Sequence, residues 1–199
     1  MAIRKLKAIV TGIAPLLQNN PQTVDRFNPY AKEMAKITAK KTRRTDEDYR
    51  TFGDIEVRSK VHWDSEAGVF MPSTCLMAAI CKNSFSLKKI AKDRIRGAVF
   101  MDDFKLPLQY RDSDKVRTLD DIVGNPDFRF QMTLKQGQVR IVKHVPIFHK
   151  WSFGASLEYD DLQMDGDDLE AIIKYSAQYG GFGDFRPTFG RAVAEVTHS

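Results

Sequence analysis

The sequence predicts an α+β protein built around one antiparallel sheet. Short stretches with alternating apolar side chains, at residues 3–13, 152–159 and 191–198, indicate strands. Two stretches with helical apolar spacing, which begin near Ser73 and at Asp165, indicate the two main helices. With the weaker strand candidates between them, the order becomes β-α-β-β-α-β with additions, which is the ferredoxin-like pattern.

Length and composition fit a single folded domain. The chain has 199 residues, 42% of them hydrophobic, so one domain with insertions is expected. No apolar run approaches the ~20 residues that a membrane helix needs, and residues 1–7 lack a signal-peptide pattern. We therefore expect a cytoplasmic protein without a membrane partner. Cys75 and Cys81 are expected to be buried thiols, and neither a metal nor another cofactor is expected.

The charge is unevenly distributed along the chain. Residues 1–100 carry 19 Lys/Arg and 10 Asp/Glu, hence +9, whereas residues 101–199 carry 12 and 16, hence −4. The first half should therefore attract polyanions. The acidic second half offers a surface for a basic neighbour, such as another copy of the chain.

The first strand precedes a turn and a basic insertion. Leu6, Ala8 and Val10 share one face of the strand, which Pro15 ends. Residues 22–60 then form a basic, finger-like insertion, with a weak helical pattern at 30–42 and a strand pattern at 55–63. Two interpretations stay open for the insertion, a solvated mobile loop or a flexible basic finger that lies along a phosphate backbone. Its candidate phosphate contacts are Arg26, Lys36, Lys40, Lys41, Arg43 and Arg44.

The first main helix ends in a second basic patch. Leu76, Ala79 and Ile80 belong to its expected inner stripe, and six basic residues against one acid follow between Lys82 and Arg96. Because a helix C-terminus needs fewer cations than this, we expect the patch to face phosphate. Its candidate residues are Lys82, Lys88, Lys89 and Arg96.

The middle of the chain predicts short strands and a hairpin. Residues 96–101 and 105–110 are short strand candidates, and residues 128–134 and 138–144 are alternating runs joined by a glycine turn. The second main helix follows at 165–179, with acidic residues in its first turns. Its expected inner stripe consists of Leu169, Ile172, Ile173 and Ser176.

A glycine-rich loop at residues 180–191 joins this helix to the last strand. Permissive backbone, aromatic rings and guanidinium groups suit a ligand with phosphates and bases. The alternative is a helix C-cap with Gly180 in the left-handed conformation, followed by a tight connection. Arg191 has a second expected role, pairing with the acidic helix start near Asp167 and Asp168. The candidate binding residues are Gly181, Phe182, Gly183, Phe185, Arg186, Phe189 and Arg191.

Three motifs resemble the RAMP superfamily of CRISPR effector proteins, whose members have modified ferredoxin-like (RRM-like) folds. They are Thr11-Gly12-Ile13-Ala14-Pro15-Leu16-Leu17, Phe70-Met71-Pro72-Ser73, and Gly181-Phe182-Gly183 through Phe189-Gly190-Arg191. The chain is most similar to the repeating backbone subunits that line a guide RNA, and to stand-alone phage relatives of them. The resemblance implies one RAMP-like domain over residues 1–199, in a prokaryotic cell and encoded there or by a phage.

Together, these observations predict a non-catalytic protein that binds single-stranded RNA or DNA and assembles as a homo-oligomer, side by side along the strand. One alternative is a metal-independent endoribonuclease of the RAMP type, for which the candidate acid–base residues are His62, His144, His149 and His198. Another is a structural or inhibitory phage protein that binds protein through the acidic run at 158–170.

Overall fold

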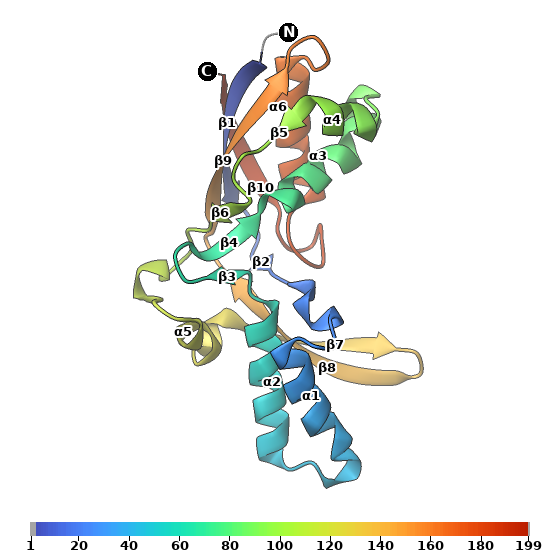
Figure 1. Cartoon of the computed structure of the whole chain (residues 1–199), viewed down its shortest axis with the longest axis vertical. Coiled ribbons are helices and arrows are strands. Elements are labelled where there is room, and N and C mark those ends of the chain that lie inside the picture. Colours follow the sequence, from blue (N-terminus) through green and yellow to red (C-terminus); the bar gives the residue numbers. More distant parts are fainter. Residues whose placement is uncertain (1–2, 199) are drawn as a thin grey trace. The chain divides into compact units, whose positions relative to one another are not determined.

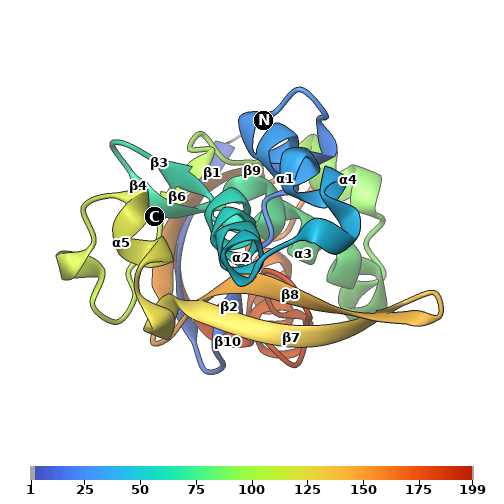
Figure 2. The same ribbon diagram turned by 90° about the horizontal axis from the view of Figure 1, so that it is seen from below.

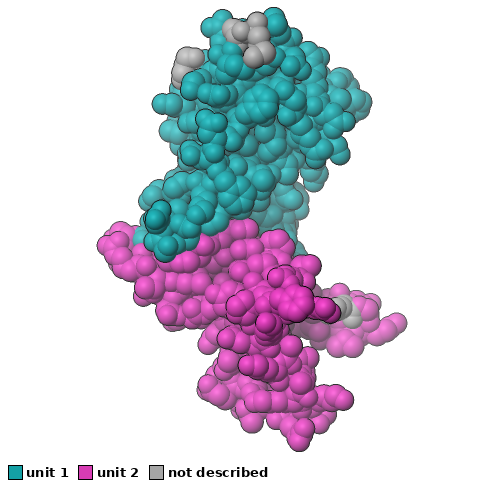
Figure 3. Space-filling model, viewed as in Figure 1, with its two compact units in different colours: residues 1–16, 64–113, 148–199 teal, residues 17–63, 114–147 magenta. Residues whose placement is uncertain are grey.

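The computed structural model describes residues 3–198, without the side chain of residue 136 (Figure 1). The fold is α+β with antiparallel pairing, as the sequence predicts, but the described strands form three sheets and not the one expected. The chain forms two compact units (Figure 3). Unit 1 comprises residues 1–16, 64–113 and 148–199, and unit 2 comprises residues 17–63 and 114–147. The insertion expected at 22–60 therefore lies in unit 2, together with a later segment that the sequence analysis did not connect to it.

The central sheet of unit 1 has the order β10-β1-β9-β5. Its strands are β1 (Ile3–Gly12), β5 (Val99–Phe100), β9 (Ser152–Asp160) and β10 (Ala192–His198). Each neighbouring pair is antiparallel, with Val10 opposite both Ala194 and Phe153. Leu6, Ala8 and Val10 are buried, which confirms the predicted inner face of β1.

Helices α3 (Ser73–Lys88) and α6 (Gly166–Tyr175) pack against each other in unit 1. The predicted inner stripes of both helices are buried at Leu76, Ile80, Leu169 and Ile172. The Asp165 side chain caps α6 by accepting from the Asp168 N–H at 3.0 Å. A π-helical turn, Ser176–Gly180, extends α6 to the glycine-rich loop.

The segment after α3 differs from the prediction. Helix α4 (Lys92–Ala98) occupies much of the strand expected at 96–101, and only β5 remains extended. Ile95 and Ala98 are buried on one side of α4, so a short amphipathic helix buries the apolar residues that suggested a strand. The rest of unit 1 includes the antiparallel pair β4 (Gly68–Pro72) and β6 (Lys105–Pro107).

An aromatic cluster forms part of the core of unit 1. Trp151 is fully buried, and its Nε1–H donates to the Ala14 carbonyl at 2.8 Å. A Cβ at Gly12 would lie 2.3 Å from the Trp151 ring, so the turn after β1 requires glycine at this position. The Phe153 and Phe182 rings complete the cluster with a centroid distance of 5.5 Å.

Unit 2 contains a helical hairpin, α1 (Pro29–Ala39) and α2 (Asp46–Lys60). Asn28 caps α1 by accepting from the Tyr30 N–H at 2.9 Å, and Thr45 and Asp48 form a capping box at the start of α2. The strand predicted at 55–63 is therefore wrong up to residue 60. Helix α2 contacts both α1 and α5 (Leu119–Val123), so it is buried on several sides and lacks a clean helical stripe.

A second hairpin in unit 2, β7 (Arg129–Gln136) and β8 (Val139–Phe148), confirms the predicted pair of alternating runs. Its free end extends past α1 and α2 in both ribbon views (Figure 1, Figure 2). Buried Glu56 of α2 accepts from the His144 N–H at 2.9 Å and pairs with Lys60 and Lys143 at 3.3 and 3.1 Å. These contacts join the β hairpin to the helical hairpin.

The remaining short elements lie in connections. Strands β2 (Leu16–Leu17) and β3 (Trp63–Asp64) occur where the chain passes from one unit to the other. Short 3-10 turns are found at Pro21–Val24, Lys41–Arg43, Ser113–Lys115 and Pro126–Phe128.

Candidate nucleic-acid interface

The net positive charge of the chain belongs to unit 2. Unit 2 carries 16 Lys/Arg and 11 Asp/Glu, hence +5, whereas unit 1 carries 15 of each and is neutral. The contrast between the two halves of the sequence thus becomes a contrast between two folded units. A polyanion is attracted to unit 2.

The cations of the expected insertion lie on α1 and on the turn after it. Lys32, Lys36 and Lys40 are exposed and spaced four residues apart, so they lie along one side of α1. Lys40 pairs with Asp48. Within residues 3–198, Lys36, Lys41 and Arg43 pair with no carboxylate. The segment folds as a capped helical hairpin, which corrects the expected loop and confirms the weak helical pattern at 30–42. That it lies along a phosphate backbone stays a prediction.

An exposed aromatic ring stands at the start of this hairpin. Phe27 is 64% exposed, the guanidinium carbon of Arg26 lies 4.8 Å from its ring centroid, and the Lys32 ammonium lies 5.8 Å from it. A solvent-facing ring with two cations suits base stacking next to phosphate. The sequence analysis missed Phe27, although its position between basic residues was a usable signal.

A groove in unit 2 has a volume of about 500 Å³. It is lined by residues from α1, the following turn, α2 and β8, namely Ile37, Thr38, Arg44, Tyr49, Phe52, Ile141, Val142 and Lys143. Arg44 donates from Nη2 to the Thr38 carbonyl at 3.1 Å, which fixes its guanidinium at the end of α1. Sequence reasoning missed the groove because its two sides are about a hundred residues apart in the chain.

The second predicted basic patch, at the end of α3, is partly neutralised within unit 1. Lys88 pairs with Asp168 at 2.8 Å, and this carboxylate raises the pKa of the Lys88 ammonium. Arg96 lies 3.7 Å from Asp93, and Lys89 lies over the Phe85 ring at 5.5 Å. Lys82 is exposed. Lys88 and Arg96 are therefore less available to phosphate than Lys36, whereas Lys82 and Lys89 stay exposed without a carboxylate partner in the described chain.

The base of the glycine-rich loop serves the fold. The Phe182 N–H donates to the Gly190 carbonyl at 2.8 Å, and a Cβ at Gly190 would lie 1.8 Å from the Phe182 carbonyl oxygen. The expected left-handed cap at Gly180 is wrong: the glycine with a positive φ after the helix is Gly181, with φ 68° and ψ 174°, which is an extended rather than a left-handed helical conformation. Phe182 is fully buried, which corrects its predicted stacking role: in this fold its ring contacts only protein.

The tip of the same loop is open to solvent. Phe185 is 39% exposed, and Arg186 is exposed and pairs with no carboxylate within residues 3–198. Gly183, with a φ of 73°, and Phe189 are half-buried at its sides. Phe185 and Arg186 therefore remain accessible candidates for a base and a phosphate.

Arg191 is exposed and pairs with neither Asp167 nor Asp168 in the described part of the chain. Its carbonyl accepts from the Ile13 and Ala14 N–H groups at 2.8 and 3.1 Å. The Arg191 backbone thus holds the turn after β1. The ion pair expected between the Arg191 side chain and Asp167 or Asp168 is not formed in the described chain.

The open face of the central sheet in unit 1 mixes apolar and polar side chains. Ile9, Phe100 and Val193 are 56%, 46% and 45% exposed, and they lie on the face opposite to Leu6 and Val10. The Lys5 ammonium on this face pairs with Glu158 at 2.8 Å. This face offers apolar contact area, and Lys7, which also lies on it, is exposed and has no carboxylate partner in the described chain.

The histidines are divided between the two units. Burial lowers the pKa of His62 to about 4, so His62 is neutral at pH 7 and is a weaker base than an exposed histidine, which disfavours it as a general acid or base. Burial, followed by the Arg129 charge, lowers the pKa of His144. His62 and His144 belong to unit 2, and His149 and His198 belong to unit 1.

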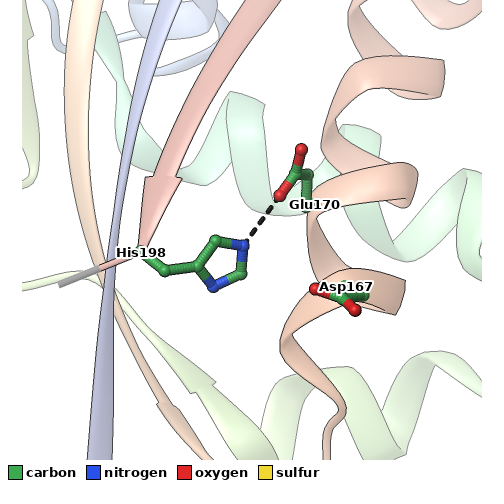
Figure 4. Close-up of side chains that lie close together, drawn as sticks. All are labelled: Asp167, Glu170 and His198. Atoms are coloured by element: carbon green, nitrogen blue, oxygen red, sulfur yellow. Dashed lines mark hydrogen bonds and ion pairs between the residues drawn. The ribbon is translucent and has the colours of Figure 1, made fainter.

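One group in unit 1 has donor atoms close enough for a metal ion. The donor atoms of Asp167, Glu170 and His198 lie within 4.8 Å of one another, and His198 Nε2 lies 2.7 Å from Glu170 Oε2 (Figure 4). The Lys174 ammonium lies 2.6 Å from the other Glu170 oxygen. Because Lys174 and His198 already engage both oxygens of Glu170, a cation would have to compete with them.

Across residues 3–198, no helix combines the length and the apolar character needed to cross a bilayer. Searches against protein-family models and against curated proteins found no match for this chain.

Proposed function

We propose that this chain is a non-catalytic protein that binds single-stranded nucleic acid and assembles side by side along the strand. The observation that carries the proposal is the +5 charge of unit 2, together with the exposed cations Lys36, Lys41 and Arg43 that no carboxylate of the described chain neutralises. Surface charge without an internal partner attracts phosphate and releases counterions when it binds.

The topology of unit 1 supports a ferredoxin-like interpretation and, with it, the likeness to the RAMP superfamily. Numbering only its four sheet strands along the chain gives the spatial order fourth, first, third, second. Helix α3 lies between the first two in sequence, and α6 lies between the last two. A β-α-β-β-α-β unit has this order, and nucleic-acid modules of this topology present an open sheet face to the strand.

The charge contrast supports head-to-tail assembly. Unit 1 is neutral overall but concentrates acidic side chains near the start of α6, where Asp165 and Asp167 are exposed. We infer that the basic unit 2 of one copy meets this acidic end of the next. Repeated along a strand, such a contact gives a filament rather than a closed pair.

Fluorescence anisotropy with 20-nucleotide single strands of RNA and DNA, at 50 and 200 mM salt, tests the proposal. We expect the affinity to fall by at least about tenfold across this range. Six or more phosphate contacts lower the affinity by more than this amount. A matched duplex should bind less tightly. Absence of binding at 50 mM salt contradicts the proposal, and shortening of the RNA during incubation supports the histidine-dependent nuclease instead.

A further inference from the structure

We propose that the groove lined by Arg44, Tyr49 and Val142 is a base pocket, which takes one unstacked base of the bound strand and the phosphate beside it. This inference rests on the proposed function and adds to it a specific site for the base, beside the C-terminal end of α1.

The groove has the size and lining of a nucleotide site. Its volume of about 500 Å³ lies within the range of roughly 300–1,000 Å³ that is typical of small-molecule pockets. Tyr49 is 58% exposed and Phe52 is half-buried, so at least one aromatic ring is available to a flat ligand. Val142 is 49% exposed on the opposite side, which gives a second apolar surface against which a base can pack.

The charges of the groove favour an anionic occupant. None of its lining residues is acidic, and two of them, Arg44 and Lys143, are cations. Lys143 pairs with Glu56 at 3.1 Å, and the same carboxylate also pairs with Lys60 at 3.3 Å. Arg44 has no carboxylate partner in the described chain, and its buried Nε makes no hydrogen bond there.

These features together select a base with its phosphate over an uncharged apolar ligand. An apolar occupant alone would cover the rings but leave the Arg44 guanidinium partly desolvated without a counter-charge, which is costly. A phosphate at Arg44 accepts charge-assisted hydrogen bonds while the base stacks on Tyr49. Lys41 and Arg43, which are exposed and close to Arg44 in the chain, contact the next phosphates of the same strand.

The probe for this test is a 20-nucleotide single strand, either oligo-dT or oligo-U, that carries one 2-aminopurine. Stacking on an aromatic side chain quenches this base, so we expect quenching on binding to the wild-type chain. Tyr49→Ala should weaken binding by about 5- to 150-fold, as for loss of one stacked base, and should reduce the quenching. Tyr49→Trp should restore both.

A matched control is Tyr179→Ala, which removes a tyrosine of similar exposure, 59%, from unit 1. This variant should bind and quench like the wild type. Arg44→Ala should lower the slope of log affinity against log salt by about 1, whereas Tyr49→Ala should leave the slope unchanged. Thermal melts verify that all variants are folded.

The outcomes separate this inference from the proposed function. If no variant and no wild-type protein binds the probe, both fail. If the wild type binds but Tyr49→Ala matches Tyr179→Ala in affinity and quenching, the groove proposal alone is overturned. If Tyr49→Ala instead converts an oligomer to a monomer without nucleic acid, the groove belongs to a contact between copies, and the base pocket is also overturned.

Discussion

The glycine-rich loop of unit 1 and the helical hairpin of unit 2 both carry arginines and aromatic rings in a short stretch of sequence, yet they use them differently. The base of the loop turns inward, with Phe182 fully buried and Gly190 pressed against its backbone. The hairpin turns its cations outward along α1. Burying an unpaired charge costs a large free energy, whereas an aromatic ring can lie either in the core or at the surface. Charge therefore predicts exposure more reliably than aromatic content does.

Two phenylalanines within the loop provide the sharpest test of this comparison. Phe182→Ala should lower the free energy of unfolding by about 3–5 kcal/mol, because it leaves a cavity beside Trp151 and Phe153. Phe185→Ala, at the exposed tip, should change it by less than about 1 kcal/mol. Urea unfolding measures both. Equal losses would show that the tip packs as tightly as the base.

Matched charge removals compare the two basic regions directly. The triple variant of Lys36, Lys41 and Arg43 to Ala should weaken single-strand binding and lower the salt slope by about 2, since each cation lost from a phosphate contact of a single strand removes about 0.7. Its melting temperature should stay within about 2 °C of the wild type, because these side chains are exposed.

The control removes the same number of charges from unit 1, at Lys82, Lys89 and Arg96. We expect a change in salt slope of less than about 1, because Arg96 already pairs with Asp93 and unit 1, unlike unit 2, carries no net charge. Equal effects of the two triple variants would mean that only net charge matters, and would remove the distinction between the hairpin and the α3 patch.

Elements with a clear local period were predictable from the sequence. Strands β1, β9 and β10, helix α6 and the β7–β8 hairpin each show alternation or a helical stripe within one segment, and each is present. Helix α2 was misassigned because Ile55, Val57 and Ser59 alternate as in a strand, and all three are buried by contacts on different sides of the helix.

The candidate site was less predictable because it depends on distant contacts. The cations of α1 followed from composition alone, and their exposure agrees with that expectation. The groove could not be predicted from composition, because Tyr49 and Val142 line it together only after the two hairpins of unit 2 pack against each other. The stacking role predicted for Phe182 was wrong because the sequence does not indicate that Trp151 and Phe153 pack around its ring.

Unit 2 should also be the more acid-sensitive of the two around His62. Burial lowers the pKa of His62 to about 4, below its unfolded value of about 6.5. The unfolded chain therefore binds the proton first, so stability is full above pH ~6.5 and is lost as the pH falls towards 4. After allowance for partial exposure, the loss should be roughly 1–3 kcal/mol.

Urea unfolding between pH 4 and 7.5 measures this loss. His62→Gln should reduce the slope of the profile and leave the part that His144 contributes, because burial lowers the pKa of both rings. His149→Gln, in unit 1, should leave the slope in place. If the wild-type stability does not decrease between pH 6.5 and 4, the His62 ring is hydrated in the folded protein and its environment differs from the structure.

The smallest expected effect lies at the acidic end of unit 1, where Lys174 and then His198 lower the pKa of Glu170. Because the folded-state pKa of this carboxyl is depressed, its stabilisation is present above the unfolded value of about 4.5 and is lost as the pH falls through the folded value. The pairs are partly exposed, so His198→Gln should cost less than about 1 kcal/mol at pH 7. The cost should decrease as the pH falls through the folded-state pKa of Glu170, because the protonated carboxyl loses its charge.

Lys174→Gln, which removes the larger cause of the pKa shift, should cost at least as much at pH 7. A cost of His198→Gln that does not decrease in acid would mean that the ring acts by packing over Gly166, where a Cβ would lie 3.1 Å from it, and not by its contact with Glu170.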